Sequence, residues 1–138
     1  MGGAKRYDAV TEKIIAAAIQ VHRELGPGLL ESTYEACLEH QLRGHGQQVE
    51  RQVGLPVCYQ GITLNQGYRV DLLVERTVTV EIKSVEAVTE LHCAQTRSYL
   101  KLSRLPVALL INFNCRLLKQ GLRRFLHPGN DAESATSP

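Results

Sequence analysis

Apolar residues recur at helical spacing in two stretches near the start of the chain. Between Thr11 and Leu25 they fall at steps of four, three and four, which forms one face of an amphipathic helix. Gly26-Pro27-Gly28 ends this stretch, and Glu31 to Arg43 repeats the pattern before a second glycine-rich break. The sequence therefore predicts a pair of helices at the beginning of the domain.

The middle of the chain has the shorter period of β-strands. Val49 to Tyr59 alternates and is rich in β-branched residues, and Gly54 and Pro56 within it are typical of an irregular or edge strand. Gln60-Gly61 is a turn signal. We therefore predict three or four strands in succession, within Val49–Tyr59, Ile62–Leu64, Tyr68–Val74 and Val78–Lys83.

The last part of the pattern returns to a helix and then to strands. Thr89 is a suitable N-cap for a helix reaching about Ser103. The continuously apolar run from Val107 to Phe113 is typical of a strand covered on both faces, and Gly121 to Leu126 fits one more strand. This order predicts an α/β fold with a mixed central β-sheet flanked by helices.

Length and charge add limits. A chain of 138 residues is long enough for one core, so we expect a single domain over residues 1–127. Residues 128–138 have the composition of a disordered tail. The net charge of +2 neither requires nor excludes a nucleic-acid partner. Six basic residues would form either a basic rim around an acidic site or ordinary solvated surface: Arg97, Lys101, Arg104, Lys119, Arg123 and Arg124.

Cysteine use and hydropathy point to a compartment. The four cysteines lie far apart among apolar residues without any Cys-x-x-Cys pair, which favours buried reduced thiols and a cytoplasmic protein. Together with the histidines they show no ligand spacing typical of zinc. No apolar run reaches membrane-spanning length, and Met1 to Asp8 lacks the hydrophobic segment of a secretory signal.

Candidate chemistry lies in the predicted strands. Alternation from Val78 to Lys83 places Glu81 and Lys83 on one face, and antiparallel pairing across the short connection after Val74 brings Asp71 beside Glu81. Two carboxylates attract Mg²⁺ or Mn²⁺, which activates a bound water, and a lysine can orient that water and stabilise charge on a phosphate. A solvated strand face with a cross-strand ion pair is the alternative interpretation.

Four motifs in order match a known family. Gly28 to Tyr34 has the pattern Gly-x-x-Glu-x-x-Tyr, and Asp71, Glu81-x-Lys83 and Gln95-x-x-x-Tyr99 follow. From roughly Thr11 to Phe125 the chain resembles the bacterial and archaeal GxxExxY family, which is assigned to the PD-(D/E)xK nuclease superfamily. The resemblance implies a restriction-endonuclease-like core. Val70 stands where the superfamily is named for a proline, which is often replaced.

The resemblance also implies roles. Asp71 and Glu81 would bind the metal and Lys83 would assist attack by water. Glu31 would be a third metal carboxylate or a ligand of the metal's water shell. Gln95 would hydrogen-bond Lys83 or a phosphate oxygen.

Three further residues are candidates for substrate binding. Tyr99 lies one helical turn after Gln95 and shares its face. Tyr34 closes the first motif, and both tyrosines have core-edge packing as the alternative. Arg69 shares the face of Asp71 and would contact a phosphate, or else form a salt bridge to an acidic neighbour.

The leading hypothesis is a Mg²⁺- or Mn²⁺-dependent nuclease that cleaves DNA. The alternative is a nucleic-acid-binding or regulatory module with a vestigial or partner-dependent site. A third, weaker hypothesis, a hydrolase of small phosphorylated metabolites, lacks a glycine-rich phosphate loop. Superfamily members often dimerise, which favours a homodimer, although the apolar stripe of the first helix would serve equally well to cover its own sheet.

Overall fold

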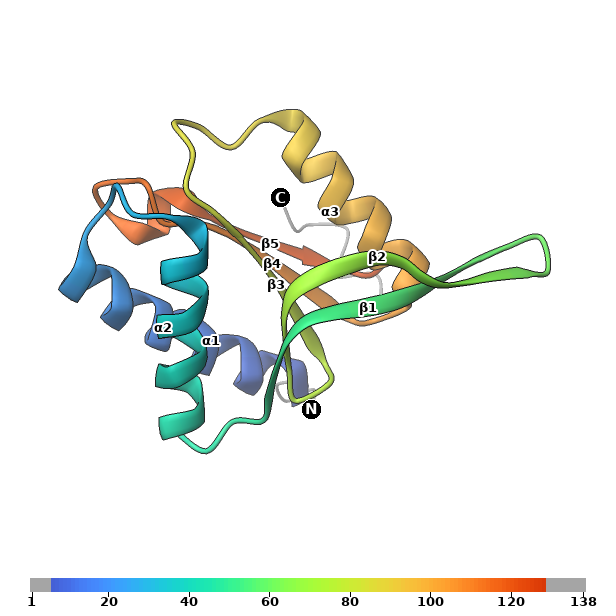
Figure 1. Cartoon of the computed structure of the whole chain (residues 1–138), viewed down its shortest axis with the longest axis horizontal. Coiled ribbons are helices and arrows are strands. Elements are labelled where there is room, and N and C mark those ends of the chain that lie inside the picture. The colour runs from blue at the N-terminus through green and yellow to red at the C-terminus, as the bar shows by residue number, and fades with distance from the viewer. Residues whose placement is uncertain (1–5, 129–138) are drawn as a thin grey trace, which may run out of the picture.

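Strand order in the sheet follows chain order, with five strands numbered β1 to β5 (Figure 1). The computed structural model describes residues 6–128. Only β3 and β4 run parallel, and α3 connects them, whereas the other neighbouring pairs are antiparallel. The predicted mixed sheet is confirmed, with strands β1 (Val49–Tyr59), β2 (Ile62–Val74), β3 (Val78–Lys83), β4 (Val107–Asn112) and β5 (Leu122–Leu126).

The first two helices, α1 (Arg6–Leu25) and α2 (Glu31–Gly44), cover one face of the sheet. Their apolar stripes pack on the side chains of β3 that alternate inward, Val78, Val80 and Ile82. The stripe of α1 is thus used within its own chain. The helix begins at Arg6, earlier than the predicted Thr11, because Tyr7 and Val10 extend the same stripe toward the core.

The third helix, α3 (Glu90–Ser103), covers the opposite face (Figure 1). Its predicted N-cap is confirmed, since the Thr89 hydroxyl accepts a hydrogen bond from the backbone N–H of His92 at 3.2 Å. Leu100 packs there against Ala108 and Leu110 of β4. Every residue of β4 is therefore buried, as the continuous apolar run predicted.

A long two-stranded ribbon, formed by β1 and β2, extends away from the helices (Figure 1). The ribbon's root is the part at Val49–Val53 and 70–74, and its tip is the part at 57–64. β1 is the predicted edge strand and has a bulge between Leu55 and Val57. β2 is one continuous strand, so the predicted break between Leu64 and Tyr68 is wrong: pairing with β1 resumes on both sides of it.

The remaining expectations are partly tested. All four cysteines are free thiols, but the prediction that they are buried is wrong for three of them: only Cys93 is buried, and Cys58 in the ribbon is exposed. After β4 comes a short 3-10 helix, η1 (Leu118–Gly121), which leads into β5. No helix within residues 6–128 is long and apolar enough to cross a membrane. The predicted disordered tail lies, apart from Pro128, outside the described residues.

Candidate active site at the end of strand β3

The carboxylate of Asp71 ends the backbone ladder between β2 and β3. The last paired residues are Leu72 and Val80, so Asp71 follows directly opposite Glu81 in the same register. There the side chain replaces the backbone as acceptor: Asp71 Oδ2 accepts a hydrogen bond from the N–H of Ile82 at 2.8 Å. This contact fixes the Asp71 carboxylate beside Glu81, as the predicted antiparallel pairing required.

Glu81 is half-buried on the face of β3 opposite to the α1–α2 core. Its pKa is raised to about 8, first because burial penalises the charged form and second because the Asp71 carboxylate lies nearby. The positive charge of Lys83 lowers the pKa of Glu81 only in part. Burial and the neighbouring aspartate thus disfavour the charged form of Glu81 more than Lys83 favours it.

Lys83 is the last residue of β3 and is also half-buried. Its backbone carbonyl accepts a hydrogen bond from the N–H of Phe113 at 2.9 Å, which joins the ends of the parallel strands β3 and β4. Within the described residues the Lys83 ammonium forms no ion pair closer than 4 Å. It shares a strand face with Glu81 and is not held by another carboxylate.

Glu31 ties the first turn of α2 to the end of β3. Its Oε2 accepts a hydrogen bond from the N–H of Ser84 at 3.1 Å, and the Ser84 hydroxyl donates to the carbonyl of Leu29 at 2.6 Å. These residues, with Leu30 and Ser32, line a pocket of about 410 Å³. The Gly-x-x-Glu-x-x-Tyr segment and the Glu-x-Lys strand therefore meet, although they are about 50 residues apart in sequence.

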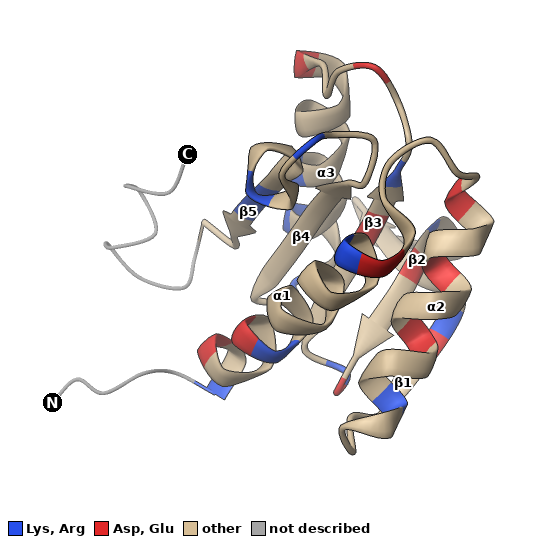
Figure 2. Ribbon diagram, turned by 90° about the vertical axis from the view of Figure 1, so that its left-hand side faces the viewer, with Lys and Arg blue, Asp and Glu red and all other residues tan. Residues whose placement is uncertain are grey.

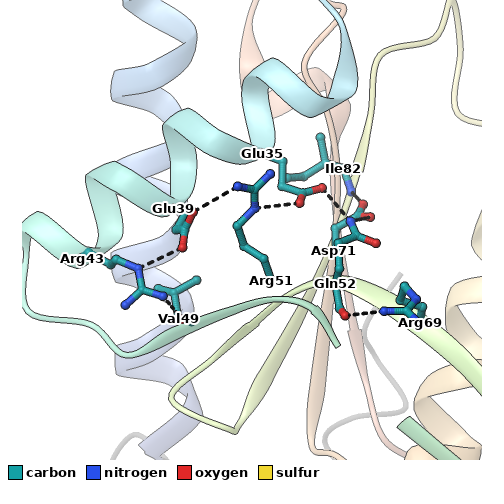
Figure 3. Close-up of polar contacts among 9 residues, drawn as sticks. All are labelled: Glu35, Glu39, Arg43, Val49, Arg51, Gln52, Arg69, Asp71 and Ile82. Carbon is teal, nitrogen blue, oxygen red and sulfur yellow. Dashed lines mark hydrogen bonds and ion pairs between the residues drawn. The ribbon is translucent and has the colours of Figure 1, made fainter. Parts of the chain in front are cut away.

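Two residues of this region were not singled out from the sequence: Glu35 and Gln52. Figure 3 shows Glu35 of α2 between Arg51 and Gln52 at the ribbon's root. The Gln52 amide donates to Glu35 Oε1 at 3.0 Å and to Asp71 Oδ1 at 3.2 Å, while Arg51 Nε donates to Glu35 Oε2 at 3.0 Å. Glu35 is buried, and Arg51 compensates its charge while the Gln52 amide supplies a further hydrogen bond.

The backbone of Gln52 explains part of this contact. Its φ is +50°, a conformation uncommon for residues other than glycine. In a regular edge strand successive side chains alternate strictly between the two faces of the sheet. The positive φ departs from this regular backbone at Gln52, the residue that joins α2 to Asp71. The only sequence signal for Glu35 was its position one helical turn after Glu31, which places both carboxylates on one face of α2.

The structure brings the Gln-x-x-x-Tyr helix near the sheet but leaves Gln95 outside the polar network. Gln95 is exposed, and within residues 6–128 it makes no hydrogen bond to Asp71, Glu81 or Lys83. Tyr99 is half-buried and stacks on Tyr68, with ring centroids 4.2 Å apart. The contribution of Gln95 to the site stays a prediction.

The other two candidates differ in exposure. Arg69 is exposed and donates to the Gln52 carbonyl at 2.7 Å, so it holds the backbone of the residue that contacts Asp71 (Figure 3). Tyr34 is fully buried, stacks on Phe113 and donates its hydroxyl to the Gly26 carbonyl at 2.6 Å. These contacts support the packing alternative for Tyr34, which closes the turn between α1 and α2.

The carboxylates fit a divalent cation in part. Asp71 and Glu81 are hard oxygen donors whose mutual repulsion a cation would relieve, and Mg²⁺ commonly binds through one or two carboxylates while keeping several waters. Nowhere in residues 6–128 do three or more His, Cys, Asp or Glu side chains lie close enough to hold a metal ion together. The described site is thus a two-carboxylate site, and Glu31 as a third ligand stays a prediction.

Comparison with known proteins decides the family. A family model described as the PD-(D/E)XK nuclease superfamily matches residues 8–125, which spans nearly all described elements. The chain belongs to this superfamily. No curated protein and no solved structure gave a significant match. The narrower resemblance to the GxxExxY family stays a prediction.

Membership of the PD-(D/E)XK superfamily indicates a nuclease with a nucleic-acid substrate. It agrees with the observed α/β architecture and with the meeting of an aspartate, a glutamate and a lysine at the end of β3. A solvated strand face would leave these groups in water, whereas Glu81 is largely withdrawn from it. The alternative interpretation of the sequence, a simple surface ion pair, therefore has less support.

Proposed function

We propose that this protein is a metal-dependent nuclease that hydrolyses phosphodiester bonds of DNA through a metal-activated water. The observation that carries the proposal is the pair Asp71 and Glu81, fixed side by side across β2 and β3 with Lys83 on the same strand. Two half-buried carboxylates side by side, one of them with its charged form strongly disfavoured, are typical of a functional site.

Asp71 and Glu81 would hold the Mg²⁺ or Mn²⁺, with Glu31 as a further carboxylate or as a ligand of its water shell. When bound, such an ion lowers the pKa of a coordinated water and polarises a phosphoryl oxygen. The Ile82 N–H and the Gln52 amide orient the two oxygens of Asp71 for this task. Both contacts come from the protein, so the ligand is positioned before a cation binds.

Lys83 would orient the attacking water and stabilise the charge that develops on the phosphate. Its freedom from ion pairs among the described residues supports this role, since an ammonium already held by a carboxylate would be less available. Gln95 and Tyr99 of α3 would approach the substrate, and exposed Arg69 would contact a phosphate. DNA is proposed as the substrate because the chain belongs to the PD-(D/E)XK nuclease superfamily.

Compartment and assembly are proposed on weaker support. Four free thiols favour the cytoplasm. A homodimer would need a surface other than the apolar stripe of α1, because that stripe packs on the chain's own sheet.

One observation favours a second candidate, a nucleic-acid-binding module whose nuclease site forms only with a partner. The described residues assemble two metal-capable carboxylates rather than three, and Gln95 stands apart from them. A partner that shifted α3 or the first turn of α2 would complete the set. This candidate predicts DNA binding without cleavage by the isolated chain.

Cleavage of labelled linear, nicked, single-stranded and circular DNA, and of RNA, tests the proposal in Mg²⁺, Mn²⁺ or EDTA. We expect metal-dependent cutting by the wild type and a loss of at least about 100-fold in Asp71→Asn, Glu81→Gln and Lys83→Ala. Matched controls are Glu50→Gln and Lys13→Ala, which remove exposed charges elsewhere. Their activity should equal that of the wild type.

Two results would contradict the proposal. Cutting that survives in Asp71→Asn would place the chemistry elsewhere or identify a contaminating nuclease. Binding of DNA by a folded wild type that cuts nothing with either metal would favour the partner-dependent module.

A further inference from the structure

A second pocket lies at the same end of the sheet as the candidate active site and has the opposite charge. It measures about 520 Å³ and lies between the end of α1 and the segment that follows β4. Its lining includes three cations, Arg23, Arg116 and Lys119, and no Asp or Glu. Glu24, the neighbour of Arg23, lines a different pocket between α1 and α2.

The three cations are available to a ligand. Each is exposed, and within residues 6–128 none of them takes part in an ion pair. The basic residues of β5 differ in this respect, because Arg124 pairs with Asp8 at 2.5 Å and Arg123 donates to the carbonyls of Gln120 and Leu122. Arg and Lys side chains without acidic partners are suited to bind phosphate oxygens.

The walls of the pocket are held by buried contacts. His22 is 8% exposed and its Nε2 donates to the Cys115 carbonyl at 2.7 Å, which ties the segment after β4 to α1. On the other wall, the Gly26 carbonyl accepts a hydrogen bond from the hydroxyl of Tyr34, whose ring stacks on Phe113. The cations therefore project from an ordered frame rather than from loosely attached loops.

The same frame connects the pocket to the candidate active site. The N–H of Phe113 is hydrogen-bonded to the carbonyl of Lys83. Arg116 follows Phe113 by three residues, so the Cα atoms of Phe113 and Arg116 are at most about 11 Å apart. On the second wall, Pro27 precedes Leu29 by two residues, and Leu29 is bonded to Ser84 directly after Lys83. Both walls thus begin beside the end of β3, where open α/β sheets commonly bind ligands.

The distribution of charge differs between the elements. Figure 2 shows mostly acidic segments along α2, basic segments around β5, and segments of both signs on α1. The acidic site can hold a metal cation, and the neighbouring pocket has basic side chains without ion pairs. Together they suit a polyanion, which presents several phosphates at once. The total charge of only +2 means that such local cations, rather than the overall field, would supply the attraction.

We propose that the pocket of Arg23, Arg116 and Lys119 binds the phosphodiester backbone of a nucleic acid, next to the phosphate that Lys83 would contact during cleavage. The inference rests on the proposed function for its substrate, but it concerns binding and is testable without cleavage. The three cations come from two separate segments, the end of α1 and the segment after β4, which suits contacts with successive phosphates of a chain.

The test measures binding of fluorescently labelled single- and double-stranded oligodeoxynucleotides in EDTA over a range of salt concentrations. Each phosphate contact contributes about 0.9 to the slope of log K against log salt for duplex DNA. We expect the slope to fall by about 1.8 in Arg116→Ala/Lys119→Ala and by about 0.9 in Arg23→Gln. The control Lys13→Ala/Arg76→Ala has the same change of net charge as the double variant, lies outside both sites and should keep the wild-type slope.

Competition separates the sources of phosphate. Sodium phosphate and sodium chloride at equal sodium concentration should weaken oligonucleotide binding equally. Stronger displacement by phosphate, lost in the double variant, would mean that free phosphate is the occupant and would overturn the assignment to a nucleic-acid backbone. An unchanged slope in both pocket variants, or a wild type that binds no oligonucleotide, would also overturn it.

Failure of the proposed function gives a different result. If the wild type binds with the expected slope and cuts no DNA in either metal, the result supports the binding pocket and contradicts the nuclease proposal. If the wild type cuts DNA and the pocket variants bind with the same salt slope as the wild type, the result supports the nuclease proposal and contradicts the binding pocket. Melting curves of both pocket variants should match that of the wild type, and Arg23 lies on a different element from the other two cations, so its variant is an independent test.

Discussion

The two ends of the β1–β2 ribbon are built from the same pairing of strands and have opposite character. At the root, Gln52 and Asp71 are charged or polar groups joined to α2 through Glu35. At the tip, no charged residue occurs between Val53 and Tyr68. Cross-strand pairing of Val57 with Leu64 and Tyr59 with Ile62 places these four side chains on one face.

Burial separates the two ends as clearly as charge does. Leu72 at the root is fully buried under α1 and α2, whereas Tyr59, Ile62 and Leu64 at the tip are 63%, 59% and 54% exposed. The apolar side chains of the tip contribute little to the described fold, while the polar side chains of the root hold the candidate site together. Polarity alone would have predicted the reverse.

The largest expected effect compares a leucine at each end. Leu72→Ala should lower the free energy of unfolding by about 3 kcal/mol, since it leaves a cavity in the core, whereas Leu64→Ala should change it by less than about 0.5 kcal/mol. Urea denaturation of both variants measures the difference. Equal losses would mean that the tip is buried in solution and that the contrast is wrong.

Titration of Glu81 at the site next to the root should make stability depend on pH. In the folded protein its pKa is about 8, against an ordinary value of 4.5. Between these values the folded state keeps a proton that the unfolded state has lost, so the stabilisation is complete below about pH 4.5 and is lost as pH rises through about 8.

The variant Glu81→Gln cannot ionise and should therefore be more stable than the wild type at pH 8, with the difference vanishing toward pH 4.5. Melting temperatures across this range in EDTA measure it. Glu50→Gln, an exposed carboxylate, is the control and should run parallel to the wild type. A Glu81→Gln curve parallel to the wild type would show that Glu81 is ionised throughout and better solvated than the structure indicates.

The sequence predicted most of what local pattern determines. Helical spacing and glycine breaks located α1 and α2, and the period of two placed Glu81 and Lys83 on one face, with Asp71 opposite. The break predicted within β2 was wrong because Asn65-Gln66-Gly67 has loop composition, and only the partner strand keeps it extended. Strand pairing is a non-local constraint that composition does not carry.

Long-range contacts were out of reach for the same reason. The link from Glu35 through Gln52 to Asp71 depends on how α2 docks on the ribbon and on the positive φ of Gln52. The burial of Tyr34 depends on Phe113, which lies 79 positions further along the chain. Each of these relations joins segments whose spacing in sequence shows no period.

A smaller effect is expected at Gln52 itself. Gln52→Gly suits the positive φ but removes the hydrogen bonds that link Asp71 to Glu35, so we expect DNA cleavage to fall by about 10- to 100-fold while the protein stays folded. Kinetics at saturating metal, compared with kinetics at limiting metal, distinguish poor chemistry from weaker metal binding. Full activity would show that Asp71 is positioned by the Ile82 N–H alone.

The smallest effect is expected at Gln60, which has nearly the same backbone conformation at the tip. Its φ is +46°, and it precedes Gly61 in the turn of the ribbon. Gln60→Gly should relieve strain at little cost, so the free energy of unfolding should change by less than about 1 kcal/mol and cleavage should be unchanged. The same substitution at two positive-φ glutamines thus tests whether function depends on the backbone or on the side chain. If Gln60→Gly reduced cleavage as much as Gln52→Gly, the ribbon would act as one unit, and the tip would have to contact the substrate.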